Sequence, residues 1–194
     1  MVELHRQAVR VSVDAVRQVT SADLQRPTPC AEWNLGQLLA HMTVQNRGFA
    51  LAAVGTRTDE KVWAPAELGA DPVGEYAASA ESVVSAFAAP GALEVAVLLP
   101  EFSATQIFPG SLAITFHLVD SVVHAWDVAR SLGRGIDLDP ELAEAAAAIA
   151  RAVPNAANRL ADGSPFAPGW PVDDGDSSIG TIVSLLGRSQ SWPN

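Results

Sequence analysis

Apolar and polar residues follow a helical period over much of the chain. Between residues 3 and 19, apolar side chains recur every three to four positions, which predicts an amphipathic helix. A second apolar stripe begins after Asn34, a good N-cap residue, with Gln37 three residues later as its capping-box partner. We expect that helix to run to about Val54, and we expect the segment 21–33, which contains two prolines, to be a loop.

Two Asp-Pro pairs mark the starts of later helices, because Asp caps a helix and Pro fits its first turn. The elements expected after the second helix are a helix from Asp71 to about Ala88, a short strand or extended segment at 93–99, a helix from Pro109 to Gly133, a helix from Asp139 to Pro154, a loop at 155–177 and a last helix at 178–186. This pattern predicts an all-α fold, an antiparallel four-helix bundle with short extra helices and at most one short extended segment.

The composition favours one domain with a substantial core. The chain has 194 residues, of which 48% are hydrophobic, and this is enough to fold as a single unit. We expect residues 1–154 to form the helical bundle, and residues 155–194 to form a loop and a short helix packed on it.

The charge excludes several classes of partner. The formal net charge is −10, and the sequence has no cluster of Lys and Arg, which argues against binding to nucleic acid or to an anionic membrane surface. The sequence contains no run of about 18 apolar residues that could span a membrane, and no signal peptide is recognisable. The single cysteine, Cys30, excludes an internal disulfide. With no recognisable signal peptide or membrane span, we expect a cytoplasmic protein.

Four polar residues form a stripe on the otherwise apolar helix that is expected to end at Gly133. They are His117, Asp120, His124 and Asp127, and their spacings of three, four and three place them on one helical face. An ordinary solvent-facing stripe stays open as an explanation. Such faces, however, usually carry Lys, Glu, Arg and Gln, whereas this stripe has only His and Asp, which must be paired or bind a metal when they are buried.

Three residues could form one metal site. Asp120 and His124 lie four residues apart, one above the other on a helix, and His41 lies on the helix that begins after Asn34. Two imidazoles and a carboxylate make an open three-ligand site that leaves positions for water or substrate. His41, Asp120 and His124 are therefore candidate ligands of a divalent metal, with zinc first and nickel or iron next. On the residues alone, His41 could instead be an ordinary helix histidine, and the site stays one of two explanations.

Neighbouring residues have more than one explanation. Asp127, three residues beyond His124, could accept the second ring N–H of a ligating histidine, or it could pair with Arg130. His117 could be a fourth ligand, a pocket wall or a hydrogen-bonded core residue. His117 and Asp127 are thus candidates for a supporting role behind the ligands, whereas His5 is expected at the surface.

For the other reactive or aromatic side chains, the sequence gives weaker evidence of a role in a functional site. Cys30 lies in a proline-flanked loop with no base beside it in the sequence, so we expect it to pack and not to act as a nucleophile. Arg130 and Arg188 could hold an anionic substrate or form surface ion pairs. Trp33 and Trp126 are expected in the core.

A resemblance to a known family rests on three stretches, which are TPCAEWNLGQLLAHMTVQN, DSVVHAWDVARSLGR and IGTIVSLLGRSQSW. They resemble motifs of actinobacterial proteins related to mycothiol-dependent maleylpyruvate isomerase, in the DinB-like metal-binding four-helix-bundle superfamily. The resemblance reaches from residue 28 to the end of the chain. It implies a DinB-like bundle whose metal ligands fall on His41, Asp120 and His124, with Asp where the isomerase has Glu.

The resemblance also implies a chemistry. A metal-bound thiol, with mycothiol as the expected co-substrate, loses its proton and can attack a small electrophile, giving S-transfer or isomerisation. Hydrolysis by a metal-activated water, binding of a metal or small ligand without turnover, and a helical interaction protein without metal stay open as alternatives. The isomerase has a separate C-terminal domain, whereas the tail after Pro154 is short, so maleylpyruvate is not the expected substrate. The expected partners are a small thiol and an electrophile, and a homodimer stays open.

Overall fold

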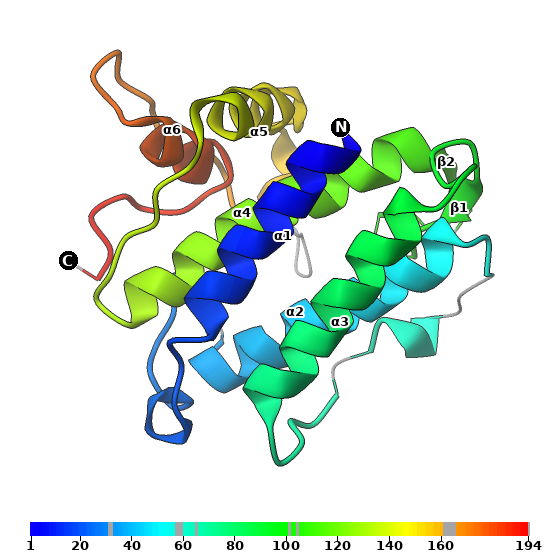
Figure 1. Cartoon of the computed structure of the whole chain (residues 1–194). Helices are drawn as coiled ribbons and strands as arrows, with labels where there is room; N and C mark the ends of the chain where they lie inside the picture. Colours follow the sequence, from blue (N-terminus) through cyan, green and yellow to red (C-terminus); the bar gives the residue numbers. More distant parts are fainter. Residues whose placement is uncertain are drawn as a thin grey trace.

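The computed structural model describes residues 1–30, 33–56, 60–64, 66–100, 102–103, 105–160 and 166–193. Its helices and strands are α1 (Val2–Val16), α2 (Leu35–Ala53), α3 (Pro72–Ala88), β1 (Ala96–Leu98), β2 (Ile107–Pro109), α4 (Gly110–Ser131), α5 (Pro140–Ala152) and α6 (Ser178–Leu185). Short 3₁₀ turns lie at Ser21–Asp23, Glu60–Val62 and Ala157–Leu160. Helices α1 to α4 form the bundle, and α5 and α6 lie against one side of it (Figure 1). The prediction of a mostly helical four-helix bundle is confirmed.

The helix starts carry the caps that the sequence predicts. The Asn34 side chain accepts a hydrogen bond from the Gln37 backbone N–H, and the Gln37 side chain accepts one from the Asn34 N–H, each 2.9 Å long. Asp71 caps α3 and Asp139 caps α5, and in both helices a proline follows in the first turn. These bonds satisfy N–H groups that a helix start leaves unpaired, and they involve residues close in sequence, so the sequence can reveal them.

A two-stranded antiparallel hairpin precedes α4. The expected extended segment 93–99 contains β1, but the sequence gives no sign of β2, because three residues are too few for an alternating pattern. The Gly110 N–H donates to the carbonyl oxygen of Val95 over 2.8 Å, so the hairpin satisfies the first N–H of α4. A Cβ on Gly110 would collide with the carbonyl oxygen of Ala92, so only glycine fits at this junction.

Side-chain contacts give the relative direction of the bundle helices. Asn46 bonds to Ser79, and farther along both helices Phe49 packs near Phe87, so α2 and α3 run parallel (Figure 1). The long connection 54–71 makes this possible, because it returns the chain to the end of the bundle at which α2 begins. Helix α4 then runs antiparallel to both α2 and α3 (Figure 1).

Helix α4 is enclosed by other helices on several sides. Its apolar residues join three clusters, which also contain Phe49 and Phe87 near the hairpin, Leu38 and Leu39 at the opposite end, and Leu142 and Ile182 from α5 and α6. The stripe on α4 therefore lies inside the molecule, with His117, His124 and Asp127 buried, and an ordinary solvent-facing stripe is excluded. Because α6 shares a core with α4 and α5, this helix is part of the packed structure. The expected boundary near residue 154 stays a prediction.

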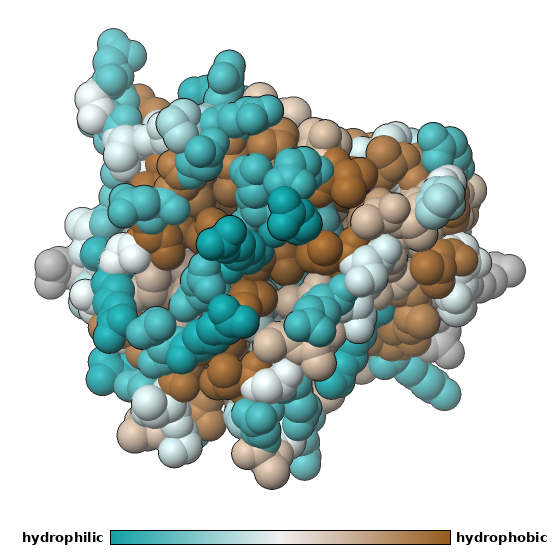
Figure 2. All heavy atoms as spheres, in the orientation of Figure 1, coloured by the Kyte–Doolittle hydropathy of each residue, from teal (hydrophilic) through white to brown (hydrophobic). Residues whose placement is uncertain are grey.

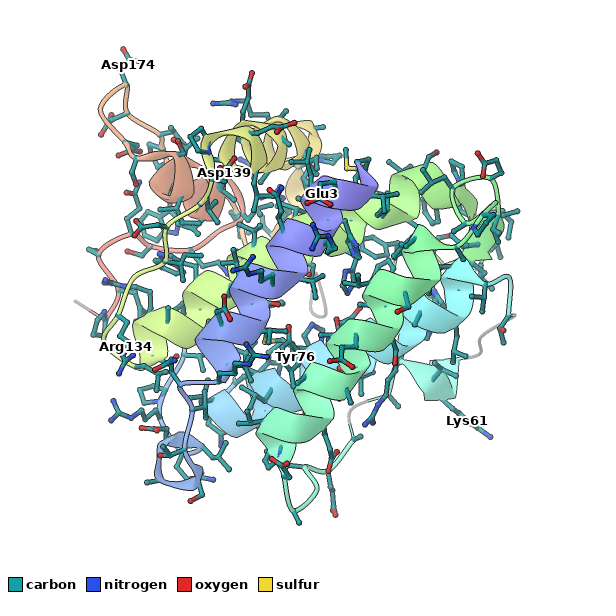
Figure 3. All side chains as sticks on the ribbon, in the orientation of Figure 1. Glu3, Lys61, Tyr76, Arg134, Asp139 and Asp174 are labelled. Carbon is teal, nitrogen blue, oxygen red and sulfur yellow. The ribbon has the colours of Figure 1, made fainter. Side chains whose placement is uncertain are left out.

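The surface carries a mixture of polar and apolar side chains. Figure 2 shows one face, on which polar side chains lie between patches of apolar ones. Figure 3 shows Tyr76 of α3 pointing into the bundle. The labelled charged residues are exposed; these are Glu3, Lys61, Arg134, Asp139 and Asp174. Among the described residues, no helix combines the length and apolar character that are needed to cross a bilayer.

Candidate functional site

The three predicted ligands come together between α2 and α4. His41 lies on α2, and Asp120 and His124 lie one turn apart on α4. One donor atom from each residue lies within 4.8 Å of the other two. Two ligands about 2 Å from the same ion are at most about 4 Å apart, so small side-chain rotations would bring all three donor atoms to one ion. The residues present therefore fit a divalent metal, and the binding itself stays a prediction.

The three residues differ in their access to solvent. The His124 side chain is 5% exposed, whereas the Asp120 side chain is 23% exposed. His41 is half-buried, and the Trp33 ring lies against it with ring centroids 4.5 Å apart. The rings of His41 and His124 are nearly perpendicular, with centroids 5.2 Å apart. The candidate centre thus has a buried wall at His124 and a more accessible side at Asp120 and His41.

The three groups have different protonation states. Burial, and to a smaller extent His124, lowers the pKa of His41 to about 4, so this imidazole is neutral at neutral pH. Burial alone would raise the pKa of Asp120, but the adjacent His124 holds it below its usual range. Burial opposes the charge on His124, yet Asp120 and Asp127 raise its pKa well above the usual value. Without a metal, His124 is therefore an imidazolium between two carboxylates, and a divalent ion would replace its Nε2 proton.

The second ring nitrogen of His124 points to a buried acid. Its Nδ1–H donates to Oδ2 of Asp127 over 2.9 Å, and the Asp127 side chain is fully buried. A carboxylate in this position fixes the tautomer that leaves Nε2 available to a metal. The alternative pairing of Asp127 with Arg130 is not what the structure has, because Arg130 donates to the carbonyl oxygen of Trp192 and lies over the ring of Trp126.

A second group of candidate ligands shares His124. Cys30, His124 and Asp127 also bring donor atoms within 4.8 Å of one another. Arg188, which is 6% exposed, donates to Oδ2 of Asp127 and to Sγ of Cys30, each over 3.1 Å. This guanidinium already supplies a positive charge among these atoms, so a divalent ion fits the group around His41 better.

Sequence reasoning missed the role of Arg188 in this cluster. We expect it from the sequence to hold an anion or form a surface ion pair, whereas its ion pair with Asp127 is buried. The expectation that Cys30 only packs is also incomplete, because its thiol contacts both Asp127 and Arg188. Arg188 lies 61 residues from Asp127 and 158 from Cys30, so no local pattern joins them. The signals available in the sequence are the apolar run IVSLL before Gly187 and Arg188, and the resemblance of this stretch to a family motif.

His117 belongs to a separate buried row of polar side chains. Its Nε2–H donates to Oδ1 of Asn46 over 3.0 Å, and its Nδ1 accepts a hydrogen bond from Nε2 of His5 over 2.8 Å. Both ring nitrogens are therefore engaged, which argues against His117 as a fourth ligand. The expectation that His5 is at the surface is wrong, since His5 is 1% exposed. It lies on the buried stripe of α1 with Ala8 and Ser12, a spacing that is visible in the sequence.

The row runs from Ser79 through Asn46 and His117 to His5, and the hydrogen bond at Ser79 fixes the direction of the others. The Ser79 hydroxyl donates to the carbonyl oxygen of Tyr76, so Ser79 accepts from the Asn46 amide, and the Asn46 oxygen faces His117. His5 Nδ1 then keeps a lone pair with no hydrogen-bond partner among the described residues. Burial lowers the pKa of His117 to about 4 and that of His5 to about 2, so both imidazoles are neutral.

Two relatives match nearly the whole chain. Each is an uncharacterized protein from a strain of Mycobacterium tuberculosis and is 32% identical to this chain over 190 residues. Each alignment covers 95% of this chain and 96% of the relative. The likeness therefore includes the C-terminal part of the chain as well as the bundle.

A solved structure and a family description also match. The crystal structure of a mutant of the mycothiol-dependent maleylpyruvate isomerase superposes with a TM-score of 0.60 and 14% sequence identity over 77% of this chain, which shows a shared fold. This chain spans 65% of the length of that isomerase. Residues 5–129 match the family described as the mycothiol maleylpyruvate isomerase N-terminal domain. With the three candidate ligands inside the matched range, the chain belongs to the mycothiol maleylpyruvate isomerase N-terminal domain family.

Proposed function

We propose that this protein binds a divalent metal through His41, Asp120 and His124 and uses it to activate a low-molecular-weight thiol of the mycothiol class. The reaction would be S-transfer to a small electrophile, or isomerisation of it. The observation that carries the proposal is the convergence of two imidazoles and a carboxylate at a partly accessible edge of the bundle interior. Membership of the family supports the choice of thiol.

The groups of the chain suit this chemistry. His41 is neutral and offers a lone pair, Asp120 is ionised, and Asp127 keeps the remaining ring proton of His124 on Nδ1. When bound to this set, a divalent ion would supply the positive charge that stabilises a thiolate at neutral pH. Asp120 and His41 are partly exposed, as access of a thiol and a substrate to the metal would require.

The substrate class follows from what a thiolate can attack. Net addition of the thiol to an electrophilic carbon gives S-transfer. Addition, bond rotation and elimination release the thiol again and give an isomer. The isomerase of similar fold is named for maleylpyruvate, but this chain spans 65% of its length, so we propose only a small electrophilic acceptor.

A second candidate function is metal binding without turnover. His124 is buried, and the groove of about 330 Å³ between α1 and the C-terminal end of α4 is lined by residues other than the three candidate ligands. A metal whose coordination positions were all closed to small molecules would serve structure and not catalysis.

Metal analysis tests the centre. Protein purified without added metal should contain close to one divalent ion per chain, and His124→Ala should lose it while keeping the helical circular-dichroism signal. His5→Gln is the matched control, because it alters a buried histidine outside the centre and should retain the metal. Full metal content in His124→Ala would contradict the proposed ligands.

Calorimetry distinguishes the two candidate functions. If the thiol reaction is correct, mycothiol should bind to the metal-loaded protein and not to the metal-free form. Equal binding to both forms would contradict activation of the thiol by the metal. Absence of binding to the metal-loaded form would favour the structural metal site.

A further inference from the structure

The imidazole of His124 lies between two groups of potential metal ligands. On the Nε2 side are Asp120, with Oδ1 at 3.3 Å, and His41. On the Nδ1 side are Asp127, with Oδ2 at 2.9 Å, and Cys30, with Sγ at 4.0 Å. Both groups are tight enough to hold an ion, so geometry alone does not decide which ring nitrogen would face the metal.

Arg188 makes the two groups different. Its guanidinium contacts both oxygens of Asp127, with Nε 3.4 Å from Oδ1 and Nη2 3.1 Å from Oδ2. Nη2 also lies 3.1 Å from Sγ of Cys30. A further N–H donates to the carbonyl oxygen of Leu186 over 2.9 Å, and the ring of Phe166 lies 5.8 Å from the guanidinium carbon. A guanidinium keeps its charge at any physiological pH, so this position is permanently cationic.

We propose that Arg188 is a positioning residue that decides which nitrogen of His124 binds the metal. Its guanidinium takes the cation position beside Cys30 and Asp127 and keeps Asp127 as the acceptor of the Nδ1–H. Nε2 is thereby left as the ligand atom, and the thiol of Cys30 is kept off the metal. This inference rests on the proposed metal site and assigns a function to the segment after α6.

Removal of the positive charge should convert the second group into a competing metal site. Without the guanidinium, Cys30, Asp127 and Nδ1 of His124 offer a thiolate, a carboxylate and an imidazole, a donor set that suits zinc or cobalt. The sulfur ligand gives this site a spectroscopic signature, because cobalt bound to a thiolate shows a charge-transfer band in the near ultraviolet that nitrogen and oxygen ligands do not give.

The test is a titration of the full-length protein with Co²⁺, followed by absorption. The wild type should bind Co²⁺ without a thiolate band. Arg188→Met should show the band, and addition of Cys30→Ser to that variant should remove it. Arg188→Lys, which keeps the charge but loses the planar fork, should show no band and should bind Co²⁺ about 10- to 100-fold more weakly, as expected when support of a ligating histidine is lost.

A second measurement covers the case in which Arg188→Met does not fold. Histidine ¹⁵N NMR of the zinc-loaded wild type should show that His124 is protonated at Nδ1 and bound to metal through Nε2. Zinc on Nδ1, a thiolate band in the wild type, or an Arg188→Met variant with wild-type spectrum and affinity would each overturn the role of Arg188. Failure of the wild type to take up any metal would overturn the proposed function and this inference with it, so the two failures are distinguishable.

Discussion

His124 donates its Nδ1–H to the fully buried carboxylate of Asp127 over 2.9 Å, within the same turn of α4. The bond fixes the ring orientation and sets which nitrogen faces His41 and Asp120. It also connects the candidate centre to Arg188, because the same carboxylate receives the guanidinium. A local pair on one helix thus depends on a residue from the far end of the chain.

Loss of the Asp127 charge should weaken metal binding. Asp127→Asn replaces an acceptor of the Nδ1–H by a neutral amide, and metal affinity should fall about 10- to 100-fold. The variant should also lose about 3–5 kcal/mol of unfolding free energy, because Arg188 is left as a buried charge without its partner. Competition with a zinc chelator and urea denaturation measure the two effects. Asp139→Asn, at an exposed helix cap, is the control and should change neither; an Asp127→Asn variant with wild-type affinity would contradict the role of this bond.

Metal uptake should release one proton from the protein near neutral pH. Against the effect of burial, Asp120 and Asp127 raise the pKa of His124 well above its usual value, so a metal must displace its proton. His41, with a pKa of about 4, has no proton to lose. Affinity should therefore fall about tenfold for each pH unit below the pKa of His124. Calorimetry in buffers of different ionisation enthalpy counts the protons, and a count of zero or two would be incompatible with these protonation states.

Acid should destabilise the protein partly through His5. The pKa of this imidazole is about 2 in the folded protein against 6.5 in the reference state, so the unfolded chain binds the proton first as the pH falls. The stabilising effect is complete above pH 6.5 and is lost as the pH falls toward the folded pKa, by about 1.4 kcal/mol for each pH unit.

The matched variant for this prediction is His5→Gln, whose amide can still donate to Nδ1 of His117 but does not titrate. The unfolding free energy of both metal-free proteins is measured by urea denaturation between about pH 6 and pH 4.5. That of the wild type should fall more steeply than that of the variant, by about 1.4 kcal/mol for each pH unit. Parallel curves for the two proteins would show that His5 is not held neutral in the folded state.

Helix α6 should contribute to the stability of the bundle. Ile182 is fully buried in the cluster that joins α4, α5 and α6, so Ile182→Ala should cost about 2–5 kcal/mol of unfolding free energy. Leu160→Ala is the control, because Leu160 is 75% exposed and its change should stay within about 0.5 kcal/mol. Equal stability of the two variants would show that α6 is not part of the cooperative core.

Features that depend on residues close together in the chain could be predicted from the sequence. The caps at Asn34, Asp71 and Asp139 gave the starts of three helices, since each cap bonds to a backbone N–H two or three residues away. The spacing of Asp120 and His124 placed both on one face, because the helical period fixes that relation. The position of His41 opposite them was a prediction helped by the family resemblance, and the antiparallel packing of α2 and α4 produces it.

Contacts between distant parts of the chain became visible in the tertiary structure and not before. It paired His5 with His117, 112 residues away, and brought Arg188 to Cys30 across 158 residues. It also paired β1 with β2 and made α2 and α3 parallel. These relations depend on the path of the connections and on how the apolar faces pack together. A periodic pattern shows which face of a helix is buried, but it does not specify which residue of another helix that face will meet.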